Sequence, residues 1–262
     1  MKYAVTIPTF GMERVEILTR TVDAFLEQTV PPALILVIDN NTEKGQLAWL
    51  DRTQKVTVCQ NDYPTPGIIH GDQTGLRIVA DLGFKYAARW DDDLVPRSDC
   101  MEKLCSVLEK PNVVAVGGMY PSPTKPGKCY LNNSGLVVPD GNPRHAQFYE
   151  WNPQNEKGVP ICSFVLRHFL YSSFVYDVEA ARAIGGFCTE YSQHSFRADT
   201  DFTLRLGQFA GLLCMVTDAV ADHHFGDGGT RRITGKTKQD MLQADLKLFG
   251  QRMSTLGIDP NY

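Results

Sequence analysis

The sequence predicts an α/β fold in which a mostly parallel sheet carries helices on both faces, followed by a smaller mixed or antiparallel region. Apolar runs of strand length alternate with helical periodicity over residues 1–118, which is typical of a parallel sheet. After Gly117 and Gly118, prolines, glycines and alternating patterns replace that succession. The 262 residues are 43% hydrophobic and 21% charged, so the chain can bury a large core.

The first half of the chain supplies the expected parallel strands. Buried strands are predicted at residues 3–7, 34–38, 55–59, 86–90 and 113–116. Between them, apolar residues at three- and four-residue spacing predict helices at 15–26, at about 71–87 and around 100–108. Pro31 and Pro32 mark the end of the first helix region.

The second half predicts a less regular arrangement. Residues 119–160 indicate loops and antiparallel strands, and their aromatic residues argue against a linker. A strand is expected at 169–176, helices at 178–184 and 199–209, and an amphipathic helix at 238–253.

Charge and cysteine usage narrow the class of protein. A net charge of −4 gives no reason to expect general affinity for nucleic acid. Seven scattered cysteines without a metal-binding spacing favour reduced thiols. The first residues lack the pattern of a signal peptide, and no apolar run is long enough to span a membrane. We therefore expect a soluble, cytoplasmic protein.

Three consecutive carboxylates, Asp91, Asp92 and Asp93, follow a predicted buried strand. Adjacent carboxylates repel one another, and a divalent cation relieves that repulsion. Mg²⁺ and Mn²⁺ prefer oxygen ligands and often take one or two carboxylates. In an extended turn, Asp91 and Asp93 would face the metal and Asp92 the other side. The alternative is a solvated acidic turn before a helix.

Five segments follow one another along the chain: Val5 to Phe10 with Arg14, Ile38 to Thr42, Gly71 to Asp93, Ala183 to Phe187, and Arg197 to Leu206. Together they resemble family 2 glycosyltransferases of the GT-A fold, across most of residues 3–225. The last two look like the family's IGGF element and its ED-x-D-L-x-x-R-L helix start. Two positions depart from the family: Ala198 replaces its glutamate, and Gln73 replaces the asparagine of its ArgAsn-x-Gly stretch.

The resemblance implies a GT-A-type single domain with a Rossmann-like sheet. It implies a nucleotide-sugar-binding half at 1–118, an acceptor-binding and catalytic half at 119–225, and a mobile loop with a C-terminal amphipathic helix at 226–262. The implied activity is inverting transfer of a sugar from a nucleoside-diphosphate sugar, such as a UDP-sugar, to an acceptor hydroxyl. The implied cofactor is Mn²⁺ or Mg²⁺.

The same resemblance places the donor beside the ends of the first strands. Asp39 would contact the base, and Asp92 the ribose or a neighbouring amide. The full donor-binding set is Thr6, Pro8, Thr9, Arg14, Asp39, Gln73, Asp91, Asp92, Arg231 and Arg232. The alternatives are an Asx-turn at Asp39 and strand termination at Thr6, Pro8 and Thr9.

The remaining roles concern the metal and the acceptor proton. The resemblance aligns Asp199 with the family's general base, and Asp201 is its competitor. Both carboxylates could instead only stabilise a helix N-terminus. His223 would complete the coordination of the metal with Asp91 and Asp93, and His224 is the alternative. Arg231 and Arg232 would close over the diphosphate in a loop rich in glycine, unless that loop is only a flexible surface.

Two other functions compete. A nucleotidyltransferase would carry a basic, glycine-rich loop after the first strand, where this chain has the single Gly11. A non-catalytic sugar- or nucleotide-binding module would not need Asp199, His223 and the three aspartates together. The acceptor stays open: a small molecule, a protein, a glycan or a modified nucleic-acid base. The basic stretch 231–238 could contact a phosphate-rich acceptor.

Overall fold

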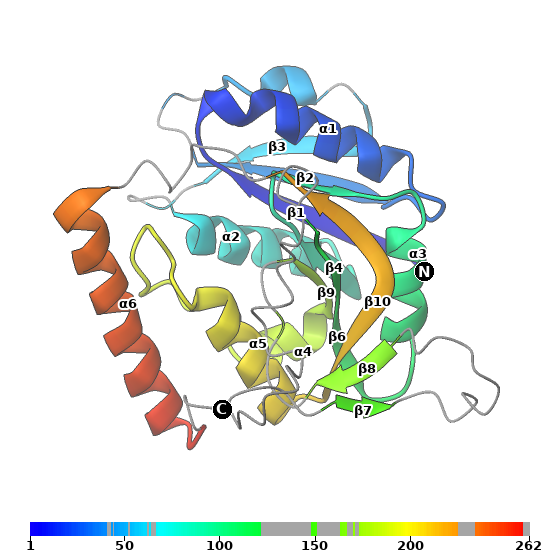
Figure 1. Cartoon of the computed structure of the whole chain (residues 1–262). Coiled ribbons are helices and arrows are strands. Elements are labelled where there is room, and N and C mark those ends of the chain that lie inside the picture. Colours follow the sequence, from blue (N-terminus) through cyan, green and yellow to red (C-terminus); the bar gives the residue numbers. More distant parts are fainter. Residues whose placement is uncertain are drawn as a thin grey trace.

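The computed structural model describes residues 1–40, 43, 45–51, 53–61, 63, 67–121, 148–150, 163–166, 170, 173–224 and 234–258. Figure 1 shows their arrangement. The strands are β1 (Tyr3–Thr9), β2 (Leu34–Asp39), β3 (Val56–Gln60), β4 (Tyr86–Arg89), β5 (Leu94–Pro96), β6 (Val113–Met119), β7 (Phe148–Glu150), β8 (Ser163–Leu166), β9 (Phe174–Asp177) and β10 (Leu212–His223). The helices are α1 (Val15–Leu26), α2 (Ile68–Asp81), α3 (Cys100–Leu108), α4 (Val178–Ala183), α5 (Ala198–Phe209) and α6 (Gly235–Thr255), with short 3-10 turns η1 (Met12–Arg14) and η2 (Ala48–Leu50).

The strands form one mixed sheet in the order β3-β2-β1-β4-β9-β6-β10-β8-β7, with β5 paired to β10. Strands β3, β2, β1 and β4 are parallel, which confirms the expectation for the first half. Strand β9 is antiparallel to both β4 and β6, and β10 is parallel to β6. The sheet therefore continues from the first half of the chain into the second.

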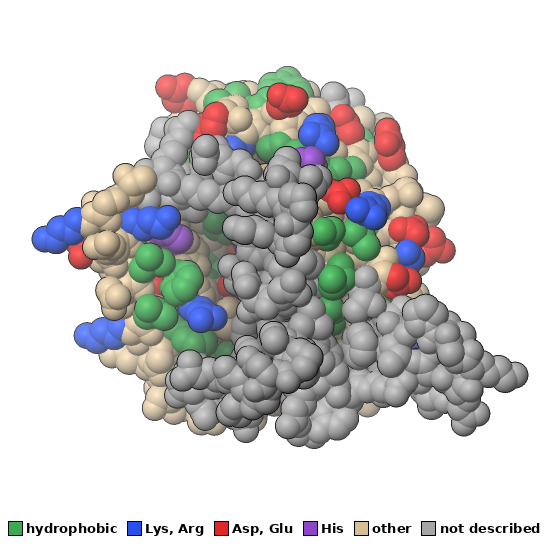
Figure 2. Space-filling model, viewed as in Figure 1, with side chains coloured by type: hydrophobic (Ala, Val, Ile, Leu, Met, Phe, Trp, Pro, Cys, Tyr) green, Lys and Arg blue, Asp and Glu red, His purple; other side chains and the backbone are tan. Residues whose placement is uncertain are grey.

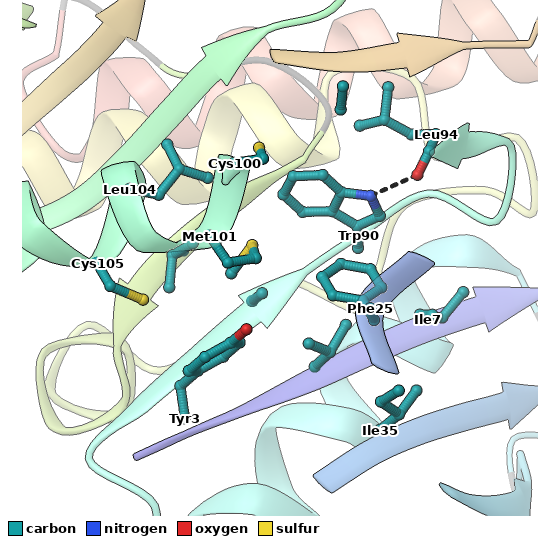
Figure 3. Close-up of a cluster of buried hydrophobic side chains, with 14 of the residues drawn as sticks. Tyr3, Ile7, Phe25, Ile35, Trp90, Leu94, Cys100, Met101, Leu104 and Cys105 are labelled. Atoms are coloured by element: carbon teal, nitrogen blue, oxygen red, sulfur yellow. Dashed lines mark hydrogen bonds between the residues drawn. The ribbon is translucent and has the colours of Figure 1, made fainter. Parts of the chain in front are cut away.

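Helices cover both faces of the sheet, and each face has its own core. Apolar residues of α1 and α3 pack on one face around Trp90, whose ring meets Phe25 edge-on at 5.3 Å between centroids (Figure 3). Residues of α2, α4 and α5 pack on the other face, where Phe187 and Phe202 stack at 3.8 Å. The amphipathic α6 adds Phe249 and Met253 to this second core.

Several elements differ from the expectation, among them β5 and β8, which no predicted strand covers. Helix α2 ends at Asp81, several residues early, because Gly83 adopts a left-handed φ of 74° and the next residues join β4. Strand β10 has no counterpart among the predicted strands. Its pairing with β6 shifts register between Met215 and Val220, where polar residues interrupt the apolar pattern that indicates a strand.

Among the described residues, no helix is both long and apolar enough to cross a lipid bilayer.

Candidate functional site

The aspartate turn joins β4 to β5 and is built around a buried indole. Trp90 donates a hydrogen bond from Nε1 to the carbonyl of Leu94 at 2.7 Å, which closes the turn (Figure 3). The Trp90 amide donates to the carbonyl of Thr6 on β1 at 3.0 Å. The Asp91 amide donates to Ser173 Oγ at 2.9 Å. These bonds place the three carboxylates at the carboxyl edge of the parallel strands, where open α/β sheets bind ligands.

The side chain of Asp92 is buried and faces two polar side chains of the protein. Thr9 donates to its Oδ2 at 2.7 Å, and Arg14 donates from Nε to both carboxylate oxygens at 3.0 Å. Arg14 Nη2 also lies 2.7 Å from Asp93 Oδ2. Burial raises the pKa of Asp92, although Arg14 opposes that shift. The expected donor contacts of Thr9, Arg14 and Asp92 are thus directed at one another, which favours a role in shaping the turn.

Asp93 meets His223, although 130 residues separate them in sequence. His223 is the last residue of β10, and its Nε2 lies 3.1 Å from Asp93 Oδ1. Both residues are 2% exposed. Burial would raise the pKa of Asp93, but the hydrogen bond with His223 and the charges beside it bring that pKa down to about 2. The His223 position belongs to a strand end and not to a flexible loop.

His224, the alternative ligand, is held differently. Its amide donates to the backbone carbonyl of Asp93 at 2.8 Å. Burial lowers the pKa of its imidazole. The described contact of His224 with the aspartate turn is therefore through its backbone, whereas His223 reaches Asp93 with its ring.

The side chains at the turn offer a divalent cation only part of a coordination shell. No group of three or more His, Cys, Asp or Glu side chains among the described residues is arranged as a complete metal site. Mg²⁺ is commonly bound through one or two carboxylates together with substrate phosphates and water. Asp93 and His223, buried side by side, supply the ligand types for such a partial site, although Arg14 and His223 contact the two Asp93 oxygens in this structure. Asp91 stands two residues away with its side chain 24% exposed.

The carboxylate of Asp91 accepts a hydrogen bond from a buried arginine, Arg89. Arg89 donates from Nη1 to Asp91 Oδ1 at 2.5 Å and from Nε to both oxygens of Asp72 at 3.1 Å. Arg89 is 5% exposed and Asp72 1% exposed. Sequence reasoning missed both residues. A charged side chain inside the apolar run of β4 was the signal that could have found Arg89, because such residues are buried only when paired.

Asp39 stands at the end of β2, directly beside Thr9 at the end of β1. It is 1% exposed, and its carbonyl accepts bonds from the Asn61 amide and the Gln60 side chain, both at 2.9 Å. Asn61 also donates to Asn40 at 2.5 Å. A buried carboxylate at this strand end lies where the resemblance places the nucleotide base.

Three other residues expected to bind the donor contact neighbouring elements of the protein. A Cβ on Gly75 of α2 would lie 2.9 Å from Thr6, and one on Gly71 would lie 2.8 Å from Pro8. Helix α2 therefore packs tightly over both β1 residues. Gln73 accepts a hydrogen bond from the Phe187 amide at 2.8 Å, which ties α2 to the turn before α5. These contacts favour structural roles for Thr6, Pro8 and Gln73.

The two candidate bases differ in their surroundings. Asp199, in the first turn of α5, is half-buried and accepts a hydrogen bond from the Thr200 amide at 2.8 Å. Asp201 is fully buried. It accepts from Tyr191 at 2.9 Å, from Arg252 of α6 at 2.5 Å and from Arg205. Asp201 is committed to an ion-pair network that joins α5 and α6, so Asp199 is the better candidate.

Asp245 of α6, which sequence reasoning also missed, anchors the loop before Asp199. Its carboxylate accepts from the Ser192 amide at 2.7 Å, from Ser192 Oγ at 2.8 Å and from the Phe196 amide at 2.8 Å. Asp245 is 1% exposed. A buried aspartate in a helix of polar composition gives no motif, so only the contacts disclose it.

Arg231 and Arg232 lie outside the described residues. Of the basic stretch that contains them, Lys236 is exposed on the first turn of α6. Figure 2 shows Lys and Arg side chains gathered on the side of the molecule where α6 lies, at the left of the view.

The chain is similar to known proteins in sequence and in fold. The sequence pattern described as "Glycosyl transferase family 2" matches residues 4–185. A glucosyl-dolichyl phosphate glucuronosyltransferase from Haloferax volcanii is 34% identical over 155 residues, which are 57% of this chain and 42% of the relative. The chain thus matches less than half the length of that relative.

Two solved structures share the fold. The structure of GalNAc-T7 with UDP, GalNAc and Mn²⁺ superposes with a TM-score of 0.65 at 14% identity. The superposed region is 97% of this chain and 48% of the GalNAc-T7 chain. The structure of S. aureus TarS 1–349 with UDP-GlcNAc has a TM-score of 0.66 at 13% identity, covering 97% of this chain and 66% of its own. The chain has the GT-A architecture of these glycosyltransferases.

Proposed function

The chain belongs to glycosyl transferase family 2, and from that premise we propose that it transfers a sugar with inversion from a UDP-sugar to an acceptor hydroxyl, assisted by a divalent cation. The observation that carries the proposal is the buried pair of Asp93, in the aspartate turn, and His223 at the end of β10. It lies at the sheet edge that also holds Asp39. The two GT-A neighbours were crystallised with UDP and with UDP-GlcNAc, which supports a UDP-linked donor.

The residues divide into donor-holding and proton-handling groups. Asp39 would bind the base at the end of β2, and Asp91, Asp93 and His223 would hold the cation. When bound there, Mn²⁺ or Mg²⁺ would neutralise charge on the departing diphosphate. Arg231 and Arg232 would add positive charge to the same group. We accordingly place donor binding in residues 1–118 and acceptor binding and catalysis in 119–225.

Proton transfer is assigned to Asp199. Its carboxylate would take the proton of the acceptor hydroxyl as that oxygen attacks the anomeric carbon, on the side opposite the leaving diphosphate. Direct displacement of this kind inverts the anomeric centre. The half-exposed position of Asp199 allows an acceptor to reach it, whereas Asp201 is enclosed by its ion pairs.

The acceptor is proposed only as a hydroxyl-bearing molecule. The relative from Haloferax volcanii acts, by its name, on glucosyl-dolichyl phosphate, and the exposed Lys236 would suit a phosphate-bearing acceptor.

The test is nucleoside-diphosphate release from a panel of nucleotide sugars, with Mn²⁺, with Mg²⁺ and with a chelator. We expect metal-dependent release of UDP, and release of the sugar in the inverted anomeric form when the product is followed by NMR within minutes. Asp199→Asn serves as the control, since it keeps the shape of the side chain and removes the base. Release that is equal with and without metal, or equal in the control, would contradict the proposal.

A further inference from the structure

We propose that Arg89 is a positioning residue, which fixes the position of Asp91 in the aspartate turn relative to Asp72 on helix α2. The inference rests on the proposed function. It concerns a residue to which the proposed function assigns no contact with donor or acceptor.

The geometry of the guanidinium carries the inference. Arg89 ends β4, and its Nε edge contacts both oxygens of Asp72 on α2 at 3.1 Å. Its Nη1 contacts Asp91 Oδ1 at 2.5 Å. A guanidinium is planar and presents its donors in a rigid fork. Because Asp72 and Asp91 contact the same rigid guanidinium, the distance between their carboxylates is restricted. Arg89 therefore links Asp91 to helix α2.

Burial separates this cluster from an ordinary surface ion pair. The side chain of Arg89 is 6% exposed and that of Asp72 2% exposed, so solvent screens their interaction little. The side chain of Asp91 is 24% exposed and reaches the surface of the turn. If Arg89 only neutralised the charge of Asp72, it would not need to contact the partly exposed Asp91 as well. The contact between Arg89 and Asp91 therefore indicates a positioning role.

The experiment separates positioning from neutralisation. Arg89→Met leaves a buried carboxylate without its counterion and should lower Tm. In the double variant Arg89→Met with Asp72→Leu, both buried charges are gone, and such replacement of an ion pair is often tolerated. We expect Tm to recover in the double variant, while the affinity for UDP with Mn²⁺, measured by calorimetry, stays about 10- to 100-fold weaker than in the wild-type chain.

Arg89→Lys is the second variant, because it retains the charge and should fold. A single ammonium cannot reproduce the fork, so its affinity for UDP with Mn²⁺ should also fall. Arg252→Met is the matched control: it breaks the ion pair with Asp201 on the α5–α6 side and should lower Tm without weakening UDP binding.

Wild-type affinity in the double variant or in Arg89→Lys would overturn the inference and leave the proposed function standing. Normal binding of UDP with Mn²⁺ but no turnover of any sugar donor would overturn the proposed function alone. Absence of UDP binding by the wild-type chain would overturn both.

Discussion

Replacing Asp201 with asparagine should destabilise the protein strongly while sparing catalysis. Asp201 is fully buried, and its carboxylate faces Arg205, Arg252 and the Tyr191 hydroxyl. Asparagine keeps the shape and one acceptor oxygen but removes the charge that both guanidinium groups need. Breaking a buried pair in this way costs about 3–5 kcal/mol.

The lower end of that range applies here. The side chain of Arg252 is 25% exposed and can turn toward water, whereas Arg205 is buried at 5% and cannot. A loss of about 3 kcal/mol corresponds to a fall in Tm of about 6–12 °C for a domain near this size. The measurement is a calorimetric scan together with urea unfolding of both proteins.

Asp199→Asn is the matched partner, in the same turn of α5. Asp199 is half-buried and accepts from the Thr200 amide, which an asparagine oxygen can also do. Its Tm should change little, and its rate of UDP release should fall by about 10²- to 10⁴-fold. Folded Asp201→Asn should retain most of that rate. An unchanged Tm with lost turnover in Asp201→Asn would refute the reasoning and return the base to Asp201.

Gly75→Ala should destabilise the fold by about 1–3 kcal/mol, because the new Cβ would lie 2.9 Å from Thr6. Gly250→Ala, in open space within α6, should stabilise the fold by about 1 kcal/mol. Urea unfolding of the two variants measures both changes. Burial raises the pKa of Asp72 from 3.8 to about 7, so the folded chain binds more protons than the unfolded chain between these values. The contribution of Asp72 to stability is therefore greatest at low pH and is lost as pH rises from about 4 to about 7. Asp72→Asn should remove a change in the free energy of unfolding of up to about 1.4 kcal/mol per pH unit in that range. The same pH dependence of unfolding in both proteins would contradict this. His223→Ala should abolish the rise in Tm that Mn²⁺ with UDP produces, while a full rise would show that the ring does not hold the cation.

Local pattern was sufficient for most of the secondary structure. Helix α1 and strands β1 to β4 follow from apolar periodicity and from glycine and proline positions, since these act over a few residues. The aspartate turn and the start of α5 are also local, because each is a polar group placed directly at the end or beginning of an element. The parallel pairing of the first strands follows from their alternation with helices.

Which side chains meet in the site was decided by the tertiary structure. The ring of His223 reaches Asp93 because β10 runs parallel to β6 and ends at the aspartate turn. The sequence pattern did not predict β10, because polar residues at its register shift interrupt the apolar run. Arg14 turned out to bind Asp92, and Arg89 to bind Asp91, since each side chain is directed by packing across the sheet.

The sequence by itself determined the α/β class, the aspartate turn and the two carboxylates at the start of α5. Only the tertiary structure gave those two different surroundings, by enclosing Asp201 between Arg205 and Arg252 and leaving Asp199 half-buried. The physical reason is that burial and long-range ion pairing depend on where α6 docks. No pattern around residue 200 contains that information.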